Sequence, residues 1–121
     1  MASIVMIFAL ALLALTPWFG PRNLPPVAVD DEVEVFGYTT YLEIPVFAND
    51  YDPEGQPIEV VALGIVDRGK AVLLQGGAVG VYPDWSAAGG SDSSKPVLIA
   101  HGSYLISDGE LVSEGQWFVW H

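Results

Sequence analysis

Short runs of β-branched and aromatic residues, each ended by turn-forming residues, fill most of the chain after Pro26. Apolar and polar residues alternate in 32–36 (EVEVF) and in 41–46 (YLEIPV), as they do in half-buried strands. Further strand-like runs cover 58–65, 71–74, 78–82, 96–106 and 111–120. No helical period interrupts them, so these residues predict an all-β domain of about seven strands, folded as a β-sandwich.

Turn residues refine this prediction at four places. Pro45 lacks a backbone donor and therefore indicates an edge strand or a bend. Residues 75–77 (QGG) predict a tight hairpin between two of the strands. Gly102 lies inside the long run 96–106 and predicts a bulge there. Residues 107–109 (SDG) separate the last two strands.

The amino-terminal segment differs sharply from the rest. Residues 1–21 carry no charged side chain, and residues 4–15 form an unbroken apolar run. A helix over residues 1–19 would be about 28 Å long, which approaches the ~30 Å thickness of a bilayer core. The expected anchoring side chains are Ile4, Ile7, Phe8, Leu12, Leu15, Trp18 and Phe19.

We therefore predict three parts: a transmembrane helix over residues 1–20, a proline-rich linker over 21–26 and the β-sandwich over 27–121. The alternative for the first part is a secretory signal peptide that is removed. No Lys or Arg precedes the apolar run and no small-x-small cleavage site follows it, so the sequence favours an uncleaved signal anchor.

The charge of the chain excludes some partners. Fifteen acidic residues face four basic ones, which gives a formal net charge of −11, and every acid lies after Val29. A domain with this negative charge is repelled by nucleic acid, because binding to nucleic acid needs Lys and Arg contacts to the phosphates. A cation, a basic protein surface and solubility are the roles that fit the excess of acids.

An acidic segment predicts a candidate calcium site. Asp50, Asp52 and Glu54 alternate in a turn, and Asp30 and Asp31 could lie beside them. Calcium binds six to eight oxygen atoms, chiefly from carboxylates and carbonyls. The alternative is a turn in which Asn49 and Asp50 bond to nearby backbone amides. No other cofactor is expected.

No residue pattern indicates catalysis. The chain has no Cys and only two histidines, His101 and His121, which is too few for a transition-metal site. No GxSxG motif frames a serine, and the glycine pairs lack the Lys of a phosphate-binding loop. We therefore predict that the protein is not an enzyme.

The last strand predicts an interaction surface. In residues 116–121 (QWFVWH), Trp117 and Val119 share one face of the strand, while Phe118 and Trp120 share the other. One face can enter the core, and the other exposes large aromatic rings of the kind that dominate protein–protein contacts. We assign Trp117, Phe118, Trp120 and His121 to a partner interface. The alternative is that a loop of the same domain covers them.

Four segments together resemble a known family. They are 25–31 (PPVAVDD), 46–58 (VFANDYDPEGQPI), 81–83 (VYP) and 104–109 (YLISDG), and they occur in this order along one repeat length. They are similar to bacterial cadherin-like or Ig-like repeats, which read PVAxDD, VLxNDxDxDGDxL, YxP and YxxSDG. The resemblance implies an extracytoplasmic Ig-like, cadherin-like Greek-key sandwich used for adhesion, spacing or assembly. The final acid of the DxDGD segment is absent here, because Gln56 follows Gly55.

A single such domain behind an anchor predicts a non-catalytic accessory subunit of a larger membrane complex, of the respiratory or photosynthetic type. Its expected partners are other subunits of that complex and, through residues 1–20, the lipid bilayer. The expected location is the bacterial cytoplasmic membrane, with the sandwich on the periplasmic side. The alternative is a secreted or surface adhesion module stiffened by Ca²⁺; a small hydrolase or ligand carrier ranks last.

Overall fold

The computed structural model describes residues 22–88 and 94–121, and within them the fold is all-β. The strands are β1 (Asp31–Glu34), β2 (Leu42–Ile44), β3 (Glu59–Arg68), β4 (Lys70–Leu73), β5 (Val79–Tyr82), β6 (Leu98–Ser107) and β7 (Val112–Trp120). Two short 3-10 helices, η1 (Val46–Asn49) and η2 (Trp85–Ala88), join them. Each strand overlaps one of the seven predicted runs, so the all-β prediction is confirmed.

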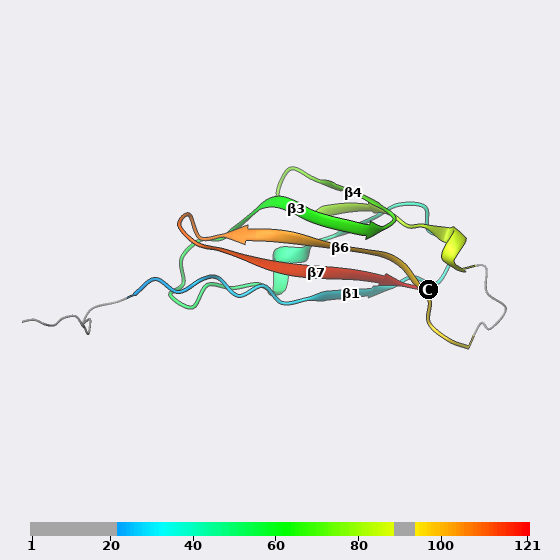
Figure 1. The fold of residues 1–121 in the computed structure, drawn as a ribbon, viewed down its shortest axis with the longest axis horizontal. Coiled ribbons are helices and arrows are strands. Elements are labelled where there is room, and N and C mark those ends of the chain that lie inside the picture. The colour runs from blue at the N-terminus through cyan, green and yellow to red at the C-terminus, as the bar shows by residue number, and fades with distance from the viewer. Residues whose placement is uncertain (1–21, 89–93) are drawn as a thin grey trace, which may run out of the picture.

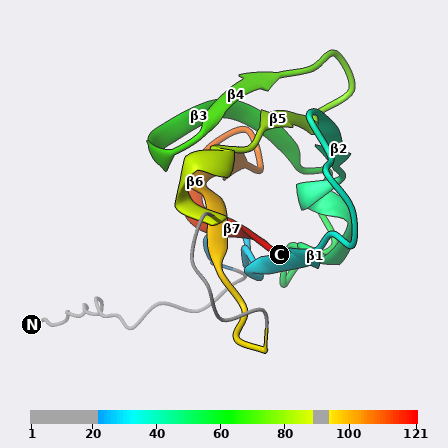
Figure 2. The ribbon, with the colours of Figure 1, turned by 90° about the vertical axis from the view of Figure 1, so that its right-hand side faces the viewer.

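The strands form two sheets that face each other. One has the order β1-β7-β6-β3 and the other the order β2-β5-β4. Figure 1 looks onto the four-stranded sheet, and Figure 2, viewed along the long axis, shows β2 and β5 of the second sheet across the interior from β7 and β1. β1 runs parallel to β7, with Asp31 opposite Trp117, whereas the other pairs are antiparallel. This is an Ig-like sandwich.

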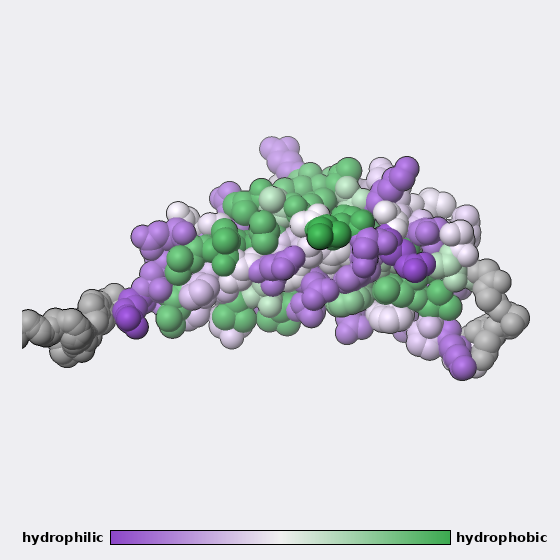
Figure 3. Space-filling view, in the orientation of Figure 1, coloured by the Kyte–Doolittle hydropathy of each residue, from purple (hydrophilic) through white to green (hydrophobic). Residues whose placement is uncertain are grey.

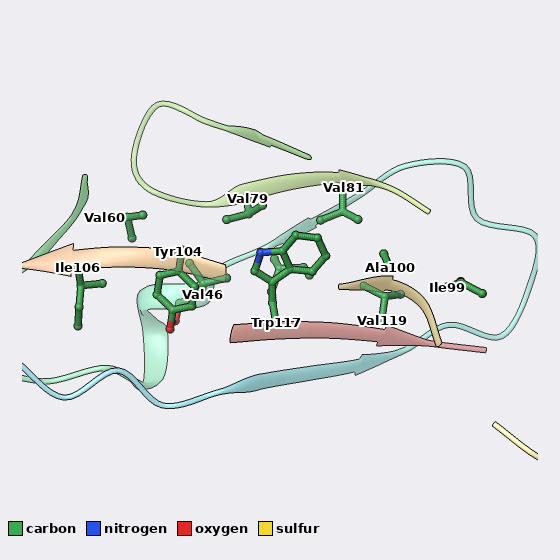
Figure 4. Packing of buried hydrophobic residues seen from close by; sticks show 11 residues of the cluster. Val46, Val60, Val79, Val81, Ile99, Ala100, Tyr104, Ile106, Trp117 and Val119 are labelled. Carbon is green, nitrogen blue, oxygen red and sulfur yellow. The ribbon is translucent and has the colours of Figure 1, made fainter. Parts of the chain in front are cut away.

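The core lies between the sheets and is built by alternation along the strands. In β7, Gly115, Trp117 and Val119 are buried, while Gln116 between them is exposed. Figure 4 shows Trp117 near the centre of this core, with Val79 and Val81 of β5 across from it. Its largest fully buried side chains are Trp117, Tyr104, Ile99, Ile106, Val46, Val79, Val81 and Val119.

Two turn predictions are confirmed. The hairpin between β4 and β5 turns at Gly76 and Gly77, both of which have a positive φ that L side chains rarely adopt. Pro45 ends the edge strand β2 and leads into η1, as its missing donor requires.

The bulge predicted at Gly102 lies instead in the neighbouring strand. Gly102 pairs regularly with Trp117 of β7, whereas β3 carries the extra residues, two of which flank Val66, the partner of Gly102. Gly102 has a different role, because a Cβ atom there would lie 2.4 Å from Cζ2 of Trp117. The indole occupies the space that a side chain at position 102 would need.

The predicted membrane anchor, residues 1–20, lies outside the described residues. Within 22–88 and 94–121, no helix has the length and hydrophobicity required to cross a bilayer. The residues assigned to the linker are held by the domain: Asn23 donates to Glu110, and the carbonyl of Pro26 accepts from the Ser113 hydroxyl. Figure 1 shows that the described chain starts at one end of the sandwich and finishes near the other.

Candidate functional site

The aromatic residues of β7 divide between the two faces of the four-stranded sheet. Trp117 and Val119 are fully buried, whereas Phe118 and Trp120 point outward and are partly exposed. The predicted division of this strand between core and surface is confirmed. The assignment of Trp117 to a partner interface is wrong, because an indole with no exposed surface cannot touch a partner of the folded domain.

Phe118 is held by side chains of the neighbouring strands. Its ring stacks on the imidazole of His101, with ring centroids 4.5 Å apart and planes inclined by 14°. The imidazole lies between Asp67 and Gln116, with its nitrogen atoms 2.6 Å from Asp67 Oδ1 and 2.8 Å from Gln116 Oε1. Both ring nitrogens of His101 are therefore engaged, and within residues 22–88 and 94–121 no serine hydroxyl bonds to them.

Trp120 lies beside the carboxylates of the edge strand β1. Its indole Nε1 donates to Glu32 Oε1 at 3.0 Å, and Glu34 is its register partner across the two strands. An open groove of about 610 Å³ lies at this edge, and its lining residues include Glu32, Glu34, Trp120, Lys95 and Pro96.

A second aromatic group adjoins this groove at the end of the sheet. The ring of Trp85 in η2 lies 4.8 Å from that of Tyr38 and, edge-on, 4.8 Å from the imidazole of His121. His121 is exposed and pairs through its backbone with Val97. Tyr38 and the nearby Phe36 are 74% and 83% exposed.

Sequence reasoning missed the contributions of Glu32, His101, Tyr38 and Trp85 to this surface. For Glu32 a signal exists, because the alternation in residues 32–36 places this side chain on the outer face of its strand. The positions of Tyr38 and Trp85 depend on irregular segments, for which no periodic signal exists.

Carboxylates are concentrated on the outer face of the four-stranded sheet. Five exposed acids lie on its strands: Glu32, Glu34, Glu59, Asp67 and Glu114. In Figure 3, which shows this side, hydrophilic residues lie between hydrophobic groups across the middle of the molecule. The strands of the other sheet carry one exposed acid, Glu43, and one exposed base, Lys70.

The acids predicted to bind calcium have other roles. Asp50 accepts hydrogen bonds from the Val29 amide and from the Tyr104 hydroxyl, both at 2.7 Å. Asp30 accepts from the Gln116 amide. The Asp52 carboxylate accepts from the amides of Glu54 and Gln56, so the side chain that closes the turn is Asp52 and not Asn49 or Asp50 as the alternative had it.

The remaining predicted ligands do not complete a metal site. The Glu54 carboxylate accepts a hydrogen bond from the Leu24 amide. Among the described residues, no three His, Asp or Glu side chains are grouped so that they could hold a metal ion. The calcium prediction is therefore not supported. Four of the five carboxylates accept hydrogen bonds from backbone amides, and Asp31 and Asp50 both lie against the Tyr104 hydroxyl.

Asp31 of β1, Asp50 and Tyr104 form a partly buried polar cluster. The Tyr104 hydroxyl lies within 3.4 Å of four acceptor oxygens, on Val29, Asp31, Val46 and Asp50, and has one proton to donate. Burial, and then the charge of Asp50, raise the pKa of Asp31 to about 6. Burial also raises the pKa of Asp50, and burial with the Asp50 bond raises that of the Tyr104 hydroxyl.

This cluster predicts that the domain becomes more stable as the pH falls from 7.5 to 5. The pKa of Asp31 is higher in the folded than in the unfolded chain, so the folded state takes up a proton first and gains stability. Because Asp31 is only half-buried, we expect a gain of about 1 kcal/mol. Urea unfolding of the full chain at several pH values measures this slope.

Two variants test the origin of the slope. Asp31→Asn should remove most of it. Asp108→Asn should leave it unchanged, since hydrogen bonds from the Leu111 and Glu110 amides lower the pKa of Asp108 and keep it ionised in this range. A slope that survives in Asp31→Asn would show that another group takes up the proton.

The chain matches the model of one protein family. The family model described as the bacterial Ig domain matches residues 23–118, which is most of the chain and nearly all of its described part. No curated protein and no solved structure matches the chain significantly.

Proposed function

The chain belongs to the bacterial Ig domain family, and we propose that it is a non-catalytic interaction module that acts as an accessory subunit of a membrane complex. In this proposal the apolar segment 1–20 spans the bacterial cytoplasmic membrane once. The sandwich lies on the periplasmic side and docks on partner subunits, as in complexes of the respiratory or photosynthetic type. Membership of this family favours an interaction or surface module, and so it supports the general part of the proposal.

The outward-facing aromatic pair of β7 is the observation that carries the proposal. Phe118 and Trp120 lie on a sheet face that no other described element covers, and neighbouring side chains fix their rings. Rigid aromatic side chains that remain partly exposed are typical centres of protein–protein interfaces. The carboxyl end of β7 also lies toward the end of the sandwich opposite the one where the described chain starts (Figure 1).

Purification from native membranes in mild detergent tests the proposal. We expect the full chain to co-purify with a partner in fixed stoichiometry. In the Phe118→Ala/Trp120→Ala variant, the amount of partner recovered with the chain should fall at least tenfold. Tyr41→Ala/Tyr82→Ala is the matched control, because it removes an aromatic pair from the other sheet, whose rings lie 4.9 Å apart. A wild-type chain that is recovered alone, as a free monomer, would refute the accessory-subunit role.

A surface adhesion module is the second candidate. The described chain begins and ends near opposite ends of the long axis, which suits a module that spaces other segments along a line (Figure 1). The two candidates differ in the fate of the leading segment. An intact mass that includes residues 1–20 favours the anchored subunit, whereas a mature chain that starts near Pro17 or later favours the secreted module.

A further inference from the structure

We propose that the groove between β1 and the segment at Lys95 and Pro96 binds a Lys or Arg side chain of the partner protein, and this inference rests on the proposed function. The groove lies on the sheet face that carries the outward aromatic residues of β7. It is lined by two carboxylates, Glu32 and Glu34, and by the indole of Trp120.

The one polar atom of the Trp120 indole is already occupied. The one donor of Trp120, its Nε1, is already bonded to Glu32 Oε1 at 3.0 Å. What remains is the π surface, which attracts cations and offers nothing to an anion. The bond to Glu32 also restricts the Trp120 side chain, so a cation that binds to the ring face causes little further loss of side-chain entropy.

The carboxylates set the sign of the charge that the groove accepts. Glu32 and Glu34 are both exposed residues of the edge strand β1, and they stand opposite Phe118 and Trp120 in the register. Lys95 lines the same groove, and the two acids still outnumber it. A guanidinium or ammonium group therefore gains both charge-assisted hydrogen bonds and a cation–π contact here.

The wider surface favours the same partner. The strands of this sheet carry five exposed acids and one exposed base, Arg68, whereas those of the other sheet carry one of each. A neutral apolar partner would have to remove Glu32 and Glu34 from water without compensation, which is costly. An anionic partner, including an anionic lipid surface, would be repelled. The chemistry points to a protein segment rich in Lys or Arg.

A fluorescent hexa-arginine peptide is the probe for this site. Titrated onto the full chain in mild detergent and followed by anisotropy, it should bind at least tenfold more weakly to Glu32→Gln/Glu34→Gln than to the wild type. Trp120→Ala should weaken binding by a similar factor, although it changes no charge. A hexa-glutamate peptide should not bind measurably.

A second pair of carboxylates on the same sheet supplies the matched control. Glu59→Gln/Glu114→Gln removes the same charge away from the groove and should change the affinity by less than threefold. If it weakens binding as much as Glu32→Gln/Glu34→Gln does, or if Trp120→Ala has no effect, the attraction is general and the groove is not a specific site. A cooperative thermal transition in each variant verifies folding.

Co-purification separates this inference from the proposed function. Loss of the native partner in Glu32→Gln/Glu34→Gln, with retention in Glu59→Gln/Glu114→Gln, supports the cationic site. Equal retention in both variants overturns the groove and leaves the interaction module standing. Absence of any partner from the wild-type chain refutes the interaction module itself.

Discussion

Trp117→Ala should lower the free energy of unfolding by about 3–5 kcal/mol, which is the range for removing a large buried aromatic side chain. The indole is fully buried between the two sheets, where it packs over Gly102 and faces the buried valines of β5 (Figure 4). Its Nε1 has no hydrogen-bond partner among the described residues, so within that part of the chain the variant breaks no side-chain hydrogen bond of this ring. Urea unfolding of the full chain in mild detergent, followed by far-UV circular dichroism, gives the value.

Trp120→Ala is the control for this prediction, because it removes the same side chain from the same strand on the opposite face. Trp120 is partly exposed, and the side-chain hydrogen bond of its indole goes to Glu32 at the surface. We expect the free energy of unfolding of this variant to fall by about 1 kcal/mol or less. Equal losses in the two variants would contradict the separation of β7 into a core face and a solvent face.

Alternation was sufficient to predict the strands and the two faces of β7. A period of two places Trp117 and Val119 together and Phe118 and Trp120 together, whatever the strand pairs with. Local turn chemistry likewise predicted the hairpin at Gly76 and Gly77, because its signal lies within a few residues.

Features that depend on distant segments could not be predicted in this way. Asp50 lies in an acidic turn that resembles a ligand loop, yet its acceptor atoms are used by Val29 and Tyr104, which are 21 and 54 residues away. The parallel pairing of Asp31 with Trp117 is equally remote in sequence. Such contacts are decided by the packing of the sheets, which a local pattern does not encode.

The candidate surface shows the same limit. Sequence reasoning identified Phe118 and Trp120 but not the side chains that orient them, His101 and Glu32. It also misplaced Trp117, because large aromatic residues serve equally well in cores and in interfaces. The register between β6 and β7 resolves this, since it sets Trp117 over a glycine on the buried side.

Gly102→Ala should lower the free energy of unfolding by about 1–3 kcal/mol, although it adds only one methyl group. The added Cβ atom would lie 2.4 Å from Cζ2 and 2.9 Å from Cε2 of Trp117, and 3.1 Å from Cγ2 of Val66. A rigid indole in a filled core cannot move aside without disturbing its neighbours. Gly37→Ala is the matched control: nothing lies within 4 Å of its Cβ, so its effect should stay within about 0.5 kcal/mol.

A double-mutant cycle tests the cause of that loss. Trp117→Phe removes the Cζ2 atom that the new methyl group would meet, and by itself it also destabilises the core. If the indole is what excludes a side chain at position 102, Gly102→Ala should cost less in the Trp117→Phe background, by about 1 kcal/mol or more. Additive losses would mean that the strain arises elsewhere, at Val66 of β3, and that Gly102 is not kept free of a side chain by the ring across from it.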